Sequence, residues 1–425
     1  MVSKFEKRAR RVRRAIRKVP VVEPVVSRAG AVVWRRHLRR QVARSQAGVD
    51  PTRLLWVDPA QVHRRLRPDT VRELIPGSAR NAIGQVRGGD WDLDVEPIDA
   101  HPFVGAARER YAEGKAWDDT RFAAEMRARI ERDGPQHRYR TPEDIARLGA
   151  RWDELADRIR VEGFRSQDEL EDGKPWEEVL IAFDRSGRLV FVEGIHRFAI
   201  ARALGVERLP VRVAARHQDW YRLSGEIRAY VNEAEGGRAY QPLLHPDLAD
   251  VPYSHDGQRF DLILDALPVR EGRLLDIGAN WGYFCHRFEA AGFSPIASER
   301  SEKQLYFLAA LRDALERRFE IWGGSITDVK DLGEFEVVLA LNVFHHFLKA
   351  ESSYQELLGL LRRLRTRYLV FEPHLPTERQ MQPAYRNPDP DEFRELVQRE
   401  TGLTEHTLLG TAGHGRPVYL LRGKA

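Results

Sequence analysis

Cysteine is nearly absent from this sequence, and long apolar runs are absent altogether. Because Cys285 is the only cysteine, no disulfide can form within the chain, and a reducing, cytoplasmic setting is expected. No apolar run approaches the roughly 20 residues of a transmembrane helix, so a membrane-spanning protein is not expected. Histidines and cysteines do not show the tight spacing of a zinc site, and we therefore expect no metal ion.

Lysine is scarce as well, with 9 residues against 60 arginines. This bias extends over the whole chain, so arginine content alone does not indicate nucleic-acid recognition, and no specific nucleic-acid partner is expected. Basic charge is instead concentrated at one end. The first forty residues carry 14 basic and two acidic side chains, whereas the remainder carries 55 basic and 62 acidic ones.

Apolar residues recur at three- and four-residue spacing in this basic segment, at Phe5, Ala9, Val12, Ile16 and Val19. The spacing predicts a basic amphipathic N-terminal helix. Through residues 1–40 such a helix could bind a membrane surface or a polyanion, or it could dock on the acidic surface of its own protein. Peripheral membrane contact of a cytoplasmic protein thus stays open.

At 425 residues the chain exceeds the usual size of one hydrophobic core, so several domains are expected. The expected parts are a basic segment (1–50), an uncharacterised linker or accessory region (51–140), a small α+β domain (141–235) and an α/β domain (251–425). Two pieces of the second part, 89–92 and 117–120, combine tryptophan with aspartate. We interpret them as turns anchored by a buried tryptophan rather than as a substrate site.

Strands and helices alternate regularly through the last part. The expected strands are 273–277, 294–299, 318–322, 335–342 and 367–372. This order predicts a parallel sheet that is covered by helices on both faces. Two further segments, 404–409 and 417–421, predict antiparallel strands that close the sheet.

The first of these strands carries the strongest motif, Leu-Leu-Asp-Ile-Gly-Ala-Asn-Trp-Gly at 274–282. An apolar strand ends in an acid, and a turn containing Gly278 and Gly282 opens a helix. Glycines allow the backbone to approach a ligand at the carboxyl edge of the sheet. Glu299 ends the next strand, 21 residues after Gly278, where a carboxylate can bind both hydroxyls of a ribose.

With these motifs, residues 251–425 resemble the class I S-adenosylmethionine-dependent methyltransferases. The resemblance implies a Rossmann-like, mostly parallel sheet with an antiparallel last strand, and S-adenosylmethionine as cofactor. A dehydrogenase is disfavoured, since the three spaced glycines of a nicotinamide site are missing. The implied cofactor-binding residues are Asp276, Gly278, Ala279, Asn280, Gly282, Glu299, Ser325, Ile326 and Asn342. Ser325 stands where the family usually has an acid for the adenine amine, so either its hydroxyl or Asp328 must serve.

Methyl transfer mainly requires positioning, but a hydroxyl acceptor also needs a base, for which histidine is suited. Two strand ends carry the candidates, which are His345, His346, Glu372 and His374. The chain lacks the Asn/Asp-Pro-Pro-aromatic sequence of methyltransferases that modify bases of nucleic acids. We therefore expect a small-molecule or glycan-type acceptor, with a hydroxyl as the acceptor group.

Residues 189–205 resemble the ParB-like and sulfiredoxin-like fold, in which a helix N-terminus binds nucleotide phosphates. The resemblance implies Glu193, His196 and Arg197 as nucleotide or phosphate ligands. Alternatively, Arg197 forms an internal salt bridge. If the nucleotide site is active, the protein could act in phosphoryl transfer, with the methyltransferase domain as an accessory module that senses S-adenosylmethionine.

Overall fold

The structure is a computed structural model that describes residues 30, 32–36, 50, 52–75, 83–136, 139–170, 173–255 and 257–423. The amphipathic helix predicted from Phe5 to Val19 lies outside these residues. The chain forms two compact units, Met1–Leu223 and Ser224–Ala425, each of which is described by itself. Within the described residues, no helix has the length and apolar character needed to cross a bilayer.

A mixed sheet in the order β1-β7-β5-β6-β2-β4 organises the first unit, and β3 also pairs with β7. Its strands are β1 (Leu55–Val57), β2 (Arg64–Leu66), β3 (Gln85–Arg87), β4 (Val95–Pro97), β5 (Val179–Phe183), β6 (Leu189–Glu193) and β7 (Leu209–His217). β5 and β6 pair antiparallel and form a hairpin. The helix that follows this hairpin is α7 (Ile195–Ala203).

The region 51–140 belongs to the same sheet as the residues that follow it. β1 and β3 pair with β7, and β2 pairs with β6. The boundary expected at residue 140 therefore does not separate two compact units. Each strand contributed by this region has three residues, too few for a period-two pattern to be recognised in the sequence.

The first unit also contains helices, and a contact with one of them explains the tryptophan piece at 117–120. The helices are α3 (Pro68–Leu74), α4 (Pro102–Ala107), α5 (Arg121–Asp133), α6 (Pro142–Glu162) and α8 (Gln218–Ala234), which runs into the second unit. Trp117 is buried and donates from Nε1 to the carbonyl of Ile145 in α6 at 3.0 Å. This piece is thus a turn anchored by a buried tryptophan, as predicted.

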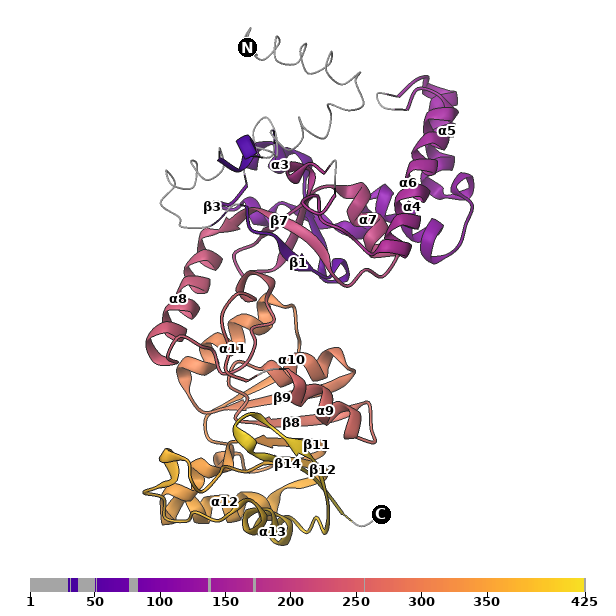
Figure 1. Ribbon diagram of the computed structural model, residues 1–425. Coiled ribbons are helices and arrows are strands. Elements are labelled where there is room, and N and C mark those ends of the chain that lie inside the picture. The colour runs from indigo at the N-terminus through magenta and orange to yellow at the C-terminus, as the bar shows by residue number, and fades with distance from the viewer. Residues whose placement is uncertain are drawn as a thin grey trace. The chain divides into compact units, whose positions relative to one another are not determined.

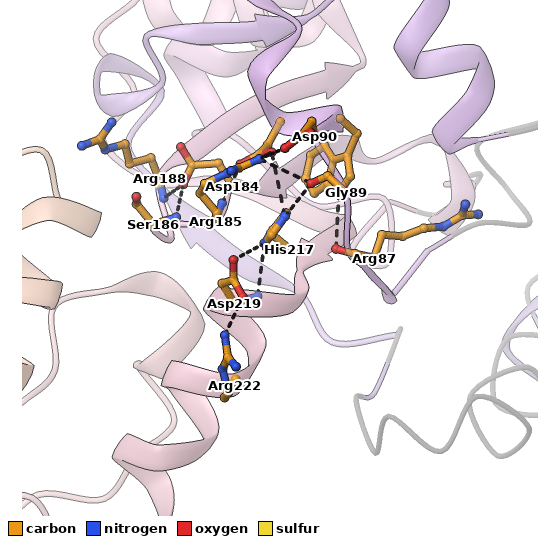
Figure 2. A network of polar contacts seen from close by, with 12 residues as sticks. Arg87, Gly89, Asp90, Asp184, Arg185, Ser186, Arg188, His217, Asp219 and Arg222 are labelled. Atoms are coloured by element: carbon orange, nitrogen blue, oxygen red, sulfur yellow. Dashed lines mark hydrogen bonds and ion pairs between the residues drawn. The ribbon is translucent and has the colours of Figure 1, made fainter.

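The piece at 89–92 is held by charged contacts as well as by Trp91, which is partly buried and packs against the core of the first unit. Figure 2 shows Arg185, from the β5–β6 turn, and His217, from the end of β7, converging on the Gly89–Asp90 loop. Arg185 donates from its backbone to Asp92 Oδ2 at 2.9 Å and from Nη2 to Asp92 Oδ1 at 2.8 Å. Burial alone would raise the pKa of Asp92, but the Arg185 hydrogen bonds hold it below its ordinary value. His217 Nε2 donates to the Gly89 carbonyl at 2.8 Å, so these contacts fasten the loop to the sheet.

The second unit contains a seven-stranded sheet in the order β10-β9-β8-β11-β12-β14-β13. Its strands are β8 (Gly272–Ile277), β9 (Phe293–Glu299), β10 (Glu320–Gly323), β11 (Glu334–Leu341), β12 (Arg365–Glu372), β13 (Glu405–Thr411) and β14 (Pro417–Arg422). The first five are parallel, and β14 lies antiparallel between β12 and β13. The Rossmann-like fold and all seven strands predicted for this part are confirmed.

Helices cover both faces of the sheet (Figure 1), as the alternation of strands and helices predicts. One face packs against α9 (Gln258–Ala266), α10 (Tyr283–Ala290) and α11 (Glu302–Ala314), and the other against α12 (Glu351–Arg363) and α13 (Pro390–Thr401). The strand order reverses between β8 and β11, with β9 and β10 on one side and β12 on the other. Open α/β sheets bind ligands at such a reversal, outside the carboxyl ends of the strands.

Candidate functional site

The β8–α10 turn forms a cradle at the carboxyl end of β8. Gly278 and Gly282 have φ angles of +76° and +80°, and Asn280 has +51°. A Cβ on Gly278 would lie 2.7 Å from Cγ2 of Val343, and one on Gly282 would lie 2.5 Å from Cδ1 of Leu308. Both glycines are therefore required by backbone conformation and by packing against the protein itself, while asparagine tolerates the left-handed region.

The cradle is fastened to the end of β9. The N–H groups of Gly278 and Ala279 donate to the carbonyl of Ser298 at 2.9 and 3.0 Å. Asn280 donates its N–H to Oε2 of Glu299 at 2.9 Å. The structure thus brings together four predicted cofactor residues from two strand ends.

Glu299 is oriented by the backbone around it. Besides the bond from Asn280, its Oε1 accepts the N–H groups of Arg300 and Ser301, each at 2.8 Å. A carboxylate has about four acceptor positions, so roughly one stays available for a ligand. The side chain is half-buried, which leaves it accessible at the edge of the cradle.

Asp276 is buried at the end of β8 and accepts a hydrogen bond from Sγ of Cys285 at 3.7 Å. Burial raises its pKa to about 7, the charge of Glu299 adds to the rise, and Arg259 opposes it. Cys285 is fully buried, and burial raises the pKa of its thiol. The cysteine is a packed thiol, as its place on the first helix indicates, rather than a nucleophile.

The segment after β10 lies beside β9, because the N–H of Gly324 donates to the Glu299 carbonyl at 3.0 Å. Ile326 is buried, and Ser325 Oγ lies 2.8 Å from Thr327 Oγ1. Asp328, the alternative adenine ligand, is exposed. Ser325 and Asp328 thus follow β10 in the chain, and a role for either of them at an adenine remains a prediction.

Asn342 directly follows β11 and has a φ of +52°. Its N–H donates to the Glu372 carbonyl at 2.9 Å, and its Nδ2 donates to the hydroxyl of Tyr240 at 3.2 Å. Its Oδ1 is buried and has no hydrogen-bond partner within the described part of the chain. A buried acceptor of this kind at the strand ends is suited to a ligand N–H or O–H group.

Three of the predicted catalytic residues are histidines that lie together. The ring of His345 is 4.0 Å from that of His346 and 6.2 Å from that of His374. His345 is buried, and neither ring nitrogen has a hydrogen-bond partner in the described ranges. Burial lowers its pKa to about 3. His346 is exposed. Within the part of the chain that the structure describes, these side chains do not form a group able to hold a metal ion.

His374 is the one histidine of the three with an orienting partner. Its Nε2 lies 3.0 Å from Oδ1 of Asn387, which fixes Nε2 as the donor. The other ring nitrogen, Nδ1, is buried, has no partner among the described residues and is available as an acceptor. Burial lowers the pKa of His374 below its ordinary value, which favours the neutral ring. Sequence patterns did not identify Asn387, which lies 13 residues further on.

Glu372, the fourth predicted catalytic residue, is held between buried arginines. Its Oε2 accepts Nη1 of Arg259 at 2.8 Å, and its Oε1 lies 3.7 Å from Nη1 of Arg416. Arg416 in turn donates from Nε and Nη2 to Glu378, whose pKa the arginine holds down at about 2 although burial opposes this. We call these four residues the arginine–carboxylate cluster. Because arginines lie against both of its carboxylate oxygens, Glu372 is poorly placed to meet an acceptor hydroxyl.

In the first unit, the predicted nucleotide ligands lie at the start of α7. Arg197 Nη1 lies 3.5 Å from Oε2 of the buried Glu178, whose pKa burial raises to about 7. His196 packs its ring against Phe103 at 4.6 Å, and Glu193 is exposed at the end of β6. This arrangement matches the alternative expectation of an internal salt bridge. A ParB-like domain and a nucleotide at Arg197 remain predictions.

No protein-family model and no curated protein matches the chain. It is similar to the bifunctional kinase-methyltransferase WbdD at 24% identity and a TM-score of 0.38, over 46% of this chain and 45% of that one. A putative O-methyltransferase from Nostoc punctiforme is similar at 17% identity and a TM-score of 0.31, over 39% of this chain and 56% of that one. The protein PH0226 from Pyrococcus horikoshii is similar at 16% identity and a TM-score of 0.30, over 39% of this chain and 87% of that one. The chain thus spans less than half of WbdD, and at these TM-scores the likenesses do not bear on activity.

Proposed function

We propose that the protein is an S-adenosylmethionine-dependent methyltransferase that acts on a hydroxyl of a small-molecule or glycan-type acceptor. The observation that carries the proposal is the cradle of Gly278, Asn280 and Gly282, fastened to Glu299 at the strand-order reversal. Bound there, S-adenosylmethionine supplies a methyl carbon that is already activated by a sulfonium. The protein then mainly has to position the two reactants.

The residues of the cradle fit this cofactor. Glu299 keeps an acceptor position for a ribose hydroxyl, and the orphaned Oδ1 of Asn342 suits a ligand donor. Asp276 lies buried at the strand end, where it would face the methionine portion. Ser325 and Ile326 would border the adenine.

We assign the base to His374. Asn387 holds Nε2 as the donor, so Nδ1 can accept the proton of an acceptor hydroxyl. His346 is the next candidate, because its exposure would allow contact with a substrate. Glu372 is disfavoured by its ion pair with Arg259.

Release of S-adenosylhomocysteine tests the proposal when the protein is incubated with S-adenosylmethionine and a panel of sugars, phenols and hydroxy acids. We expect release above the acceptor-free rate with a hydroxyl compound, and loss of that release in Glu299→Gln. Transfer only to nitrogen or sulfur acceptors would contradict the acceptor class. Failure of the protein to bind S-adenosylmethionine would contradict the proposal as a whole.

A further inference from the structure

Two buried arginines of the arginine–carboxylate cluster use their guanidinium groups differently. Arg416 donates from Nε and Nη2 to the two carboxylate oxygens of Glu378, at 2.7 and 2.9 Å. Arg259 donates only from Nη1, to Glu372 at 2.8 Å. Its own Nε and Nη2 are buried and have no hydrogen-bond partner among the residues that the structure describes. The edge of the guanidinium formed by Nε and Nη2 is therefore occupied by a carboxylate in Arg416 but unoccupied in Arg259.

This edge has a specific chemistry. A guanidinium is always charged, and two adjacent N–H groups form a planar fork that matches the two oxygens of a carboxylate. Buried donors without partners destabilise a protein, so a ligand that fills them is favoured. The Arg416–Glu378 pair provides an example of this geometry in the same unit.

The unoccupied edge of Arg259 lies near the cradle. The guanidinium of Arg259 lies 5.6 Å from the ring of Phe284, two residues after Gly282, and 5.9 Å from the ring of Tyr240. The hydroxyl of Tyr240 accepts a hydrogen bond from Asn342. The charge of Arg259 also acts on Asp276, whose pKa it lowers against the effect of burial.

We propose that Arg259 binds the α-carboxylate of the methionine portion of S-adenosylmethionine through its Nε–H and Nη2–H groups. The inference rests on the proposed function and names a specificity determinant of that same site. Glu372 has a matching role, because its hydrogen bond to Nη1 holds the guanidinium in place. Glu372 is thus a positioning residue rather than a base.

Two ligands that differ only in this group test the inference, namely S-adenosylmethionine and its decarboxylated form. Titration calorimetry of the full chain gives both dissociation constants. We expect the wild type to prefer S-adenosylmethionine by about 10- to 100-fold, the range for hydrogen bonds to a charged group. Arg259→Lys keeps a cation opposite Glu372 but removes the fork, so its preference should fall to within about threefold.

Arg416→Lys is the matched control, since it changes the same cluster at an edge that Glu378 already fills. It should keep the wild-type preference, and thermal unfolding should show both variants folded. Equal binding of the two ligands by the wild type would overturn the inference while leaving the proposed function intact. An unchanged preference in Arg259→Lys, or an equal loss in Arg416→Lys, would also overturn it. Failure of the wild type to bind either ligand would overturn the proposed function together with it.

Discussion

The N–H of Asn280 donates to Oε2 of Glu299 at 2.9 Å and so joins the turn after β8 to the end of β9. Glu299→Gln should weaken this joint, because an amide has one oxygen in place of the two that now accept three N–H groups. We expect the affinity for S-adenosylmethionine to fall about tenfold or more by calorimetry. Glu405→Gln, at a surface ion pair on β13, is the control and should bind like the wild type.

The conformation of Gly278 predicts a loss of stability on substitution. Alanine at φ +76° would be strained and would collide with Val343, so Gly278→Ala should cost at least about 2 kcal/mol. A Cβ on Gly359, inside α12, would meet no described atom within 4 Å apart from its chain neighbours and the backbone of its own helix. Gly359→Ala should therefore be neutral or stabilise by up to about 1 kcal/mol. Scanning calorimetry compares the two, and equal unfolding temperatures would contradict the account of the cradle.

The Asp92–Arg185 contact predicts the stability of the first unit. Asp92→Asn should cost about 1 to 3 kcal/mol, since the carboxylate is buried and accepts several hydrogen bonds from Arg185. Asp90→Asn removes an exposed partner of the same arginine and should cost less than about 1 kcal/mol. If the two variants lose the same unfolding free energy in urea, burial of Asp92 does not determine its contribution.

Acid should remove this contribution. Because the pKa of Asp92 is lower in the folded state than its ordinary 3.8, its stabilising effect is fully present above that value and is lost as the pH falls through the folded-state pKa. The difference in unfolding free energy between the wild type and Asp92→Asn should therefore shrink below pH 3.8. A difference that stays constant on acidification would contradict the ion pair.

Substitution of His374, which Asn387 orients, should lower the catalytic rate without weakening cofactor binding. His374→Gln should lower kcat about 100-fold or more, while the dissociation constant of S-adenosylmethionine stays near the wild-type value. Since burial lowers the pKa of His374 below its ordinary value of 6.5, the decline of the wild-type rate on acidification should have its midpoint below pH 6.5. His406→Gln, at an exposed position on β13, is the control. Unchanged kcat in His374→Gln would remove this histidine as the base.

The sequence predicted the second unit well because its strands are apolar, of four to eight residues, and alternate with helices. It did not predict the strands in 51–140, since runs of three residues carry little periodic signal. The arginine–carboxylate cluster was also missed as a unit. Arg259, Glu372 and Arg416 come from α9, β12 and the β13–β14 turn, and only folding brings their charges together.

Arg197 in the first unit shows the same limit of prediction from sequence. The motif around Arg197 indicates an anion site, but the structure pairs this arginine with Glu178, 19 residues earlier in the chain. Whether a basic residue faces a ligand or a buried carboxylate depends on tertiary contacts. Local sequence does not encode that difference.

Titration calorimetry of the full chain with S-adenosylmethionine tests the central claim most directly, with NAD as the comparison ligand. The cradle, Glu299 and the strand order predict saturable binding of S-adenosylmethionine at one site and no binding of NAD at the same concentrations. Absence of heat with S-adenosylmethionine, or tighter binding of NAD, would contradict the assignment of this site to a methyl donor.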